Sequence, residues 1–428
     1  MAQERSPRRP GKFIGGLIGT AVVVPGMGAV VVTILYVYRA VPRDSRWISG
    51  TEAYLLGTVA TICFWVVLAF LLRTRVSSVR TANTPVYNEL LEQYDRISSR
   101  IASLGAADDQ LDASARAALA EATAQIAICR RELDLEPGLP NAGALDWVLA
   151  TGYIAVWRRI HRAQEALLLV EPICDVVGTG LFDEARLENS TIPGRDQLLR
   201  QLRTAVGVLD PSAQGYLAKA EEPDAVPVEG DPRPQCQARI VLRNTSRVIN
   251  EFRDDGRESL IRARNNLYRS VLVTGLTAYV LLGLAIIRQV DESAVVAMAS
   301  FYLVGGILGL FRQLGQASSI DTVKEGDYGL ATARLVHTPL FSGLAAVGGV
   351  VLVAVLGAVI PAEQGPDIPT LGDIFNLGTN QFGLVGAAVF GLTPNLLSQR
   401  LEQQAEQYKD DLKSTEASGA SSTPNSAA

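Results

Sequence analysis

Histidine and cysteine, the side chains that most often bind zinc, are scarce in this chain, which has 428 residues but only two histidines and four cysteines. These six residues, with no C-x-x-C pair among them, are Cys63, Cys129, Cys174, Cys236, His161 and His337. Zinc sites need cysteine and histidine ligands at short, recognisable spacings. The sequence therefore predicts no metal site, and we assign it no cofactor.

The motifs of common enzymes and nucleotide-binding proteins are also missing. No G-x-x-x-x-G-K-[ST], G-x-S-x-G or H-E-x-x-H occurs, and the pair Gly178 and Gly180 lacks the third glycine and the preceding strand of a dinucleotide site. Acidic and basic residues are mixed, without the interleaved aromatic and basic stripe that indicates nucleic-acid binding. We therefore expect a protein that is not an enzyme, that binds no nucleic acid and that has no catalytic residues to assign.

Charged residues are absent from five long apolar runs, and this absence is the most informative feature of the sequence. A helix of about 20 apolar residues crosses ~30 Å of hydrocarbon, so each run is a candidate membrane span. A sixth segment, 382–397, is shorter, and we expect it to cross as a short kinked helix, with a re-entrant loop as the alternative. The five runs are 13–38, 53–72, 270–287, 293–311 and 338–360.

The composition of these runs bears on what they do. Ion-coupled transporters place ionisable side chains inside the bilayer, and none lies within the five runs, which disfavours a transporter. Small residues at helical spacing indicate close helix packing, or a self-associating helix that lines a pore. We expect Pro25 to kink the first run near its middle. The small-residue pairs are Gly15 and Gly19, Gly305 and Gly309, Ala345 and Gly349, and Ala387 and Gly391.

Basic residues near the ends of the runs predict the orientation in the membrane. They gather before the first run, after the second, before the third and between the fourth and fifth, although loop 39–52 also carries three arginines. This pattern places the N-terminus and a large inserted domain in the cytoplasm. Only five of the 39 basic residues are lysines, a bias common in GC-rich bacterial genomes, so we expect a bacterial plasma (inner) membrane.

The fold class that follows is all-α: a polytopic membrane protein with six transmembrane helices and an inserted cytoplasmic helical-bundle domain. The expected order is a basic N-terminus, two spans, the cytoplasmic domain, three to four further spans, and an amphipathic helix with a disordered tail. Within the last part, 394–412 fits either a coiled coil or a helix packed on the bundle. The boundaries are 1–12, 13–72, 73–268, 269–398 and 399–428.

The inserted domain contains a charged stretch, VWRRIHRAQEALLLVEP, at residues 156–172. Its apolar residues recur at spacings of three and four from Leu149 to Val170, a 3.5-residue seam typical of bundled helices. In this heptad His161 falls at position b, Arg162 at c, and both Arg158 and Glu165 at f, so all four are predicted to point away from the seam. We interpret them as a solvated helix face, on which His161 and Glu165 pair, and not as an active site. The alternative is a surface that docks another protein or anionic headgroups.

The chain becomes helical again from about residue 235, and only Gly256 could interrupt it before the third run. We therefore expect one helix to run continuously from the cytoplasm into the membrane, which a flexible joint at 254–256 would contradict. The sequence favours a non-enzymatic scaffold, signalling or effector protein, held in the lipid bilayer, whose bundle binds a protein partner or a second copy. No small-molecule ligand can be assigned. The alternative is a gated ion-conducting pore with the bundle as gate or oligomerisation module, and an enzyme acting on lipid is disfavoured.

Overall fold

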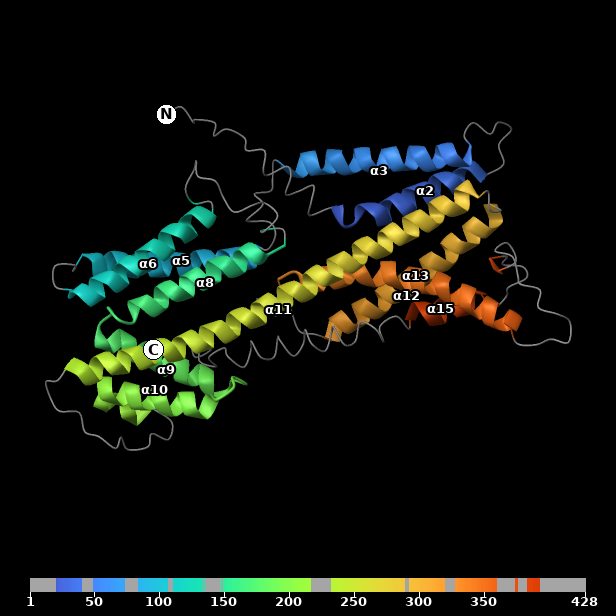
Figure 1. Cartoon of the computed structure of the whole chain (residues 1–428). Helices are drawn as coiled ribbons and strands as arrows, with labels where there is room; N and C mark the ends of the chain where they lie inside the picture. Colours follow the sequence, from blue (N-terminus) through green and yellow to red (C-terminus); the bar gives the residue numbers. More distant parts are fainter. Residues whose placement is uncertain are drawn as a thin grey trace, which may run out of the picture. The chain divides into compact units, whose positions relative to one another are not determined.

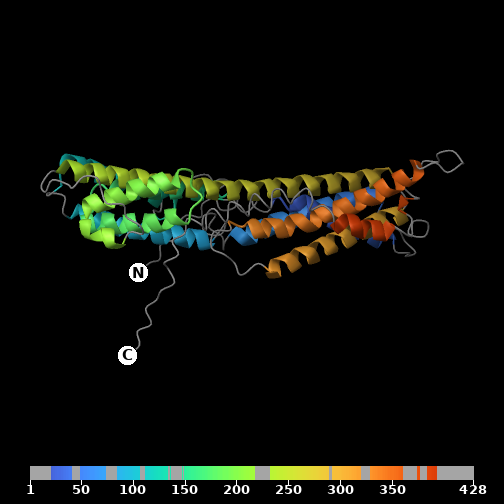
Figure 2. The same cartoon turned by 90° about the horizontal axis from the view of Figure 1, so that it is seen from below.

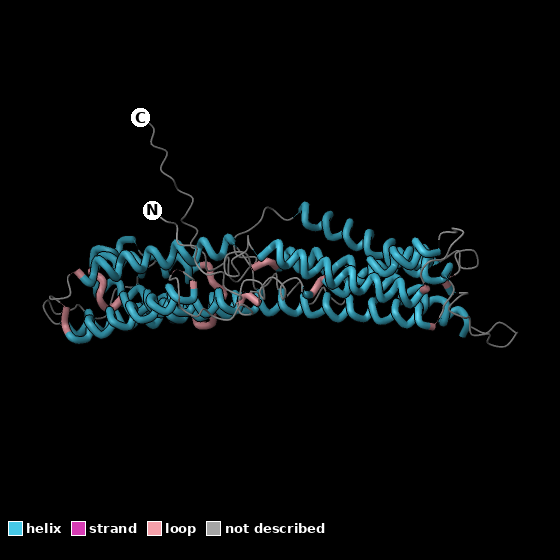
Figure 3. The backbone as a smooth tube through the Cα atoms, turned by 90° about the horizontal axis from the view of Figure 1, so that it is seen from above, coloured by secondary structure: helices cyan, strands magenta, loops and turns pink. Residues whose placement is uncertain are grey.

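The computed structural model is helical in every regular element that it describes (Figures 1 and 3). These described residues contain no strand, which confirms the all-α class. The chain divides into two compact units: unit 1 comprises residues 1–82 and 262–403, and unit 2 comprises 83–261 and 404–428. The predicted tail helix at 394–412 lies outside the described residues, which are 21–40, 49–73, 84–106, 111–133, 135, 147, 149–216, 232–288, 292–319, 328–359, 374–375 and 383–392.

Unit 1 contains the apolar helices. Four helices in the described ranges are long and apolar enough to span a membrane, and they are α3, α11, α12 and α13. Helix α15 has only ten residues, or about 15 Å at 1.5 Å per residue, and the apolar part of α2 is also short. Six spans therefore remain a prediction. The helices are α2 (Val24–Ala40), α3 (Gly50–Arg73), the last part of α11 (Pro232–Ile287), α12 (Glu292–Ser319), α13 (Leu330–Val359) and α15 (Gly383–Leu392).

The exposed side chains of unit 1 fit a hydrocarbon surrounding. Among the described residues, every exposed large apolar side chain lies in this unit except Phe182 and Ile240. Helix α3 alone exposes 62% of Leu55 and 54% of Phe64. An exposed apolar surface of this extent is unfavourable in water and marks contact with lipid or protein. A membrane protein is the consistent assignment.

Close helix packing at small residues, expected from the sequence, is present in unit 1. A Cβ atom added to Gly391 of α15 would lie 2.6 Å from the Cα of Gly305 in α12, so these two backbones touch. A Cβ on Gly305 or Gly309 would likewise collide with α13. Pro25 occupies the first turn of α2, which begins at Val24 directly after turn residues 22–23, and there its missing N–H leaves no hydrogen bond unmade. Residues 13–20 lie outside the described residues, so the kink expected in the first run stays a prediction.

Unit 2 is helical in every regular element that the structure describes there. Asp112 is the N-cap residue of helix α6, and its carboxylate accepts a hydrogen bond from the N–H of Ala115 at 2.6 Å. This bond lowers the pKa of Asp112. Gly194, in the left-handed conformation, directly precedes the helix that begins at Arg195. The helices are α5 (Thr84–Gly105), α6 (Ala113–Glu132), α8 (Thr151–Leu167), α9 (Ile173–Glu188), α10 (Arg195–Leu209), the short 3-10 helix η2 (Pro211–Tyr216) and the first part of α11.

Helix α11 contributes to both units. It runs without interruption for 56 residues, through residues 254–256, and is drawn as one continuous ribbon in Figure 2. Its first part packs Ala238, Leu242 and Ile249 into the α9–α10 core, and its last part packs Leu282 and Ile286 against α2. The structure therefore has the continuous helix expected from the sequence, without a break at residues 254–256.

Candidate functional site

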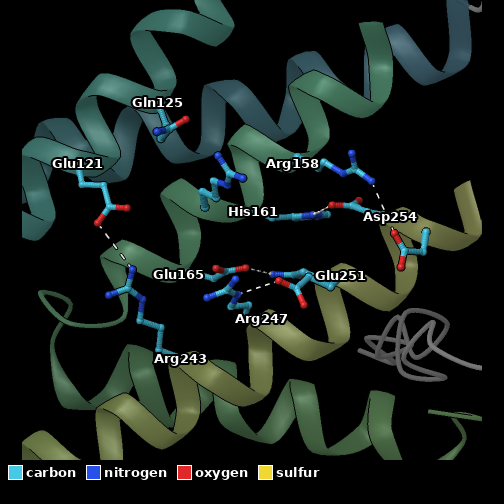
Figure 4. Close-up of a pocket in the computed structure, with 12 residues that line it drawn as sticks. Glu121, Gln125, Arg158, His161, Glu165, Arg243, Arg247, Glu251 and Asp254 are labelled. Atoms are coloured by element: carbon cyan, nitrogen blue, oxygen red, sulfur yellow. Dashed lines mark hydrogen bonds and ion pairs between the residues drawn. The ribbon is translucent and has the colours of Figure 1, made fainter. Parts of the chain in front are cut away.

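A cavity of about 550 Å³ lies inside unit 2 (Figure 4). Three helices form it: α6 contributes two lining residues, α8 four and α11 six. All twelve side chains are charged or polar. They are Glu121, Gln125, Arg158, His161, Arg162, Glu165, Arg243, Arg247, Asn250, Glu251, Asp254 and Asp255.

The most buried part of this cavity is an ion-paired cluster around Asp254. The Nδ1 atom of His161 lies 3.0 Å from one carboxylate oxygen of Asp254, and a guanidinium N–H of Arg257 donates to the other at 3.4 Å. Arg257 also stacks over the ring of Trp157 at 3.9 Å. Each of these four side chains is almost entirely buried.

Burial decides the charge of His161. Desolvation lowers its pKa below the ordinary value of 6.5, against the opposing effect of the Asp254 carboxylate, so the imidazole is neutral near pH 7. A carboxylate can only accept hydrogen bonds, so the proton of the neutral ring is on Nδ1 and is donated to Asp254. Nε2 is left as a hydrogen-bond acceptor.

A second buried contact joins Glu165 of α8 to Asn250 of α11. The amide of Asn250 donates to the carboxylate at 3.1 Å. Burial raises the pKa of Glu165, and this effect outweighs the hydrogen bond and the positive charges of Arg247 and Arg243.

The rim of the cavity carries most of the arginines. Arg158 pairs with Glu258 at 2.7 Å, Arg247 with Glu251 at 2.8 Å, and Arg243 more loosely with Glu121 at 3.7 Å. The rim pairs leave little free charge, because each guanidinium has a nearby carboxylate.

Two lining groups have no partner among the described residues. Arg162 is exposed and makes no hydrogen bond or ion pair with them. The Oε1 atom of Gln125 is buried but accepts no hydrogen bond from them. Buried acceptors are usually satisfied, so this oxygen can accept a hydrogen bond from a water or from a bound ligand.

The sequence interpretation of this helix face is therefore half wrong. Arg158 and Arg162 are exposed, as predicted, but His161 is only 5% exposed and Glu165 only 7%. Nor do His161 and Glu165 pair with each other, because each pairs with α11. The heptad pattern predicts only one buried face, whereas α8 is covered on two sides and buries eleven of its seventeen residues.

A signal for the second side was available in the sequence. Trp157, Ile154 and Ala166 lie outside the predicted seam, and all three are buried. Apolar residues on both sides of an amphipathic helix indicate that two neighbours cover it. Polar residues on α11 at the spacing of Asn250 and Asp254 could then have been matched to Glu165 and His161.

The chemistry that this cavity offers is that of carboxylates, guanidinium groups and one imidazole. None of the twelve described lining residues is a serine, threonine, cysteine or lysine. The described part of the chain also contains no group of three His, Cys, Asp or Glu side chains placed to hold a metal ion. Comparisons with protein-family models, with curated proteins and with solved structures give no match.

Proposed function

We propose that this chain is a non-enzymatic signalling component of a bacterial plasma membrane, in which unit 2 receives a signal and α11 carries it into the membrane helices. The observation that carries this proposal is the continuity of α11. Residues 243–255 of this one helix form a wall of the charged cavity, and its residues 282 and 286 belong to a core shared with α2. Because an uninterrupted helix is stiff, a displacement of α11 at the cavity wall also displaces its residues further along.

The proposed orientation places unit 2 in the cytoplasm. Four arginines precede the apolar part of α11, and basic residues are more frequent on the cytoplasmic side of a membrane span. Cys174 and Cys236 are exposed in unit 2 and serve as native reporters. A membrane-impermeant maleimide should label them in inverted vesicles and leave them unlabelled in right-side-out vesicles. The reverse pattern would contradict the orientation.

The signalling role is tested by hydrogen exchange on the full chain in nanodiscs. The substitution Asp254→Ala disturbs the cavity wall, and three glycines inserted after Ile261 interrupt the helix. We expect Asp254→Ala alone to change amide exchange in α2, where Val32 and Tyr36 pack against α11. With the glycine insertion, the change should stay within unit 2. A change restricted to unit 2 in both proteins would refute transmission through α11.

A gated pore is the second candidate, and polar groups inside unit 1 favour it. His337 Nε2 lies 3.1 Å from Ser270 Oγ, and Ser342 is 1% exposed, so polar groups lie between the packed helices of unit 1. Ionisable groups such as the His337 imidazole, when they lie within membrane segments, often mark ion or proton pathways. The test is ion flux across liposomes that carry the full chain or a chain lacking residues 83–261. Flux only after the deletion would make unit 2 a gate, and no flux from either would remove the support for a pore.

A further inference from the structure

We infer that the cavity of unit 2 binds a small hydroxylated organic anion, with Arg162 as its principal anion-binding residue and Gln125 as an acceptor for a ligand hydroxyl. This inference rests on the proposed function, for which it names the signal. The cavity volume of about 550 Å³ falls within the range of small-molecule sites, about 300–1,000 Å³.

The ligand is expected to be an anion because one arginine of the cavity has no carboxylate partner among the described residues. Three of the four lining arginines already have acidic partners, at 2.7 Å for Arg158, 2.8 Å for Arg247 and 3.7 Å for Arg243. Arg162 has none among the described residues. A guanidinium presents a planar fork of N–H donors that matches a phosphate or carboxylate group. Arg162 is therefore the group that an incoming anion would pair with, and the loosely held Arg243 can assist it.

The remainder of the ligand must be hydrophilic and must donate hydrogen bonds. The orphaned Oε1 of Gln125 and the Nε2 atom of the neutral His161 are both acceptors on the cavity wall. Hydroxyl groups satisfy such acceptors. Every side chain that lines the described cavity is polar or charged, so an acyl chain would find little apolar surface there.

Carboxylates on the same wall restrict the choice further. Asp255 and Glu251 are both engaged with rim arginines, which limits their repulsion of an anion. A small polyol phosphate, with its anion at Arg162 and its hydroxyls toward the wall, fits this pattern. The same chemistry is carried by a free metabolite and by a lipid headgroup.

The test is titration calorimetry of the full chain in nanodiscs, first of uncharged phosphatidylcholine. The probes are glycerol 3-phosphate, inorganic phosphate and glycerol. We expect glycerol 3-phosphate to bind most tightly, phosphate more weakly and glycerol not at all. Nanodiscs with added phosphatidylglycerol distinguish the sources, because a headgroup ligand would compete with the soluble probe and a free metabolite would not.

Two variants and a matched control assign the residues. Arg162→Gln should weaken glycerol 3-phosphate binding about ten- to a hundred-fold, as expected for loss of one hydrogen-bonded charge. Gln125→Met should weaken glycerol 3-phosphate several-fold and leave phosphate binding unchanged. Arg200→Gln is the control, because Arg200 is equally an exposed helical arginine of unit 2 but lies outside the cavity. It should bind like the wild type.

The outcomes separate this inference from the proposed function. No binding of either anion at millimolar concentration, or equal binding by the wild type and Arg162→Gln, would overturn the site while leaving the α11 exchange experiment unaffected. Equal affinity for phosphate and glycerol 3-phosphate would overturn the hydroxyl-binding part. Binding that depends on Arg162 but produces no exchange change in α2 would support the site and contradict the signalling role.

Discussion

The buried carboxylate of Asp254 should be essential for the stability of unit 2. In Asp254→Ala, the 6% exposed Arg257 loses the carboxylate 3.4 Å away, and the Nδ1–H of His161 loses its acceptor at 3.0 Å. Removing one partner from a buried ion pair costs about 3–5 kcal/mol, because the remaining charge stays desolvated. Arg257 keeps a weak contact with Glu89 at 3.9 Å. We therefore expect a loss at the lower end, about 3 kcal/mol of unfolding free energy.

The neighbouring residue provides a matched control. Asp255 is also in α11, and its side chain is 78% exposed, with an ion pair to Arg158 at 3.6 Å. An exposed pair of this kind contributes about 0–1 kcal/mol. Both substitutions replace an aspartate with alanine in the same helix, so the change in helix propensity is shared and cancels in the comparison.

Urea titration of the detergent-solubilised full chain measures this difference. Trp147 and Trp157 are both buried in unit 2, so their fluorescence reports on its unfolding. Asp254→Ala should lower the free energy of unfolding by at least 2 kcal/mol more than Asp255→Ala does. Equal losses, or a loss below about 1 kcal/mol for Asp254→Ala, would refute the assignment of a buried, mutually dependent cluster.

Three further predictions follow from burial and packing. Burial raises the pKa of Glu165 above 4.5, so its contribution to stability is present below pH 4.5 and is lost as the pH rises through the folded-state pKa. In urea titrations, the unfolding free energy of Glu165→Gln should therefore rise relative to that of the wild type between pH 4.5 and pH 8. A difference that stays constant with pH would contradict this. Gly391→Ala should destabilise unit 1 by about 1–3 kcal/mol in thermal unfolding in detergent, because its Cβ would strike the α12 backbone, whereas Gly386→Ala, with open space around it, should not. Burial raises the pKa of Cys129 to about 12, so iodoacetamide at pH 8 should modify the exposed Cys174 and leave Cys129 unmodified until the chain is unfolded; mass spectrometry distinguishes the two.

Much of the fold could be predicted from the sequence because it depends on periodicity and apolar length. The 3.5-residue seam identified α8, and its residues Tyr153, Val156 and Ile160 are fully buried. The apolar runs identified α3, α12 and α13, since a run without charge is a property of the sequence itself. The absence of a strong breaker before residue 270 likewise predicted the continuity of α11.

The site could not be predicted in the same way, because it depends on which helices meet. His161 and Asp254 are 93 residues apart and come together only when α8 packs on α11. A heptad assigns one buried face and leaves a second one undetected, so a buried histidine was interpreted as a solvated one. The orphaned acceptor of Gln125 is a property of its three-dimensional surroundings and leaves no trace in the local sequence.

The central claim, that one rigid helix serves both the cavity and the membrane helices, is tested most directly by a distance along α11. Spin labels replace Ile240 and Leu272, both exposed and 32 residues apart on this helix, in a chain whose exposed cysteines are changed to serine. At about 1.5 Å per residue, a continuous helix predicts a narrow distance distribution centred near ~48 Å in pulsed electron resonance. A broad distribution, or one centred at a much shorter distance, would show a joint between the labels and contradict the account.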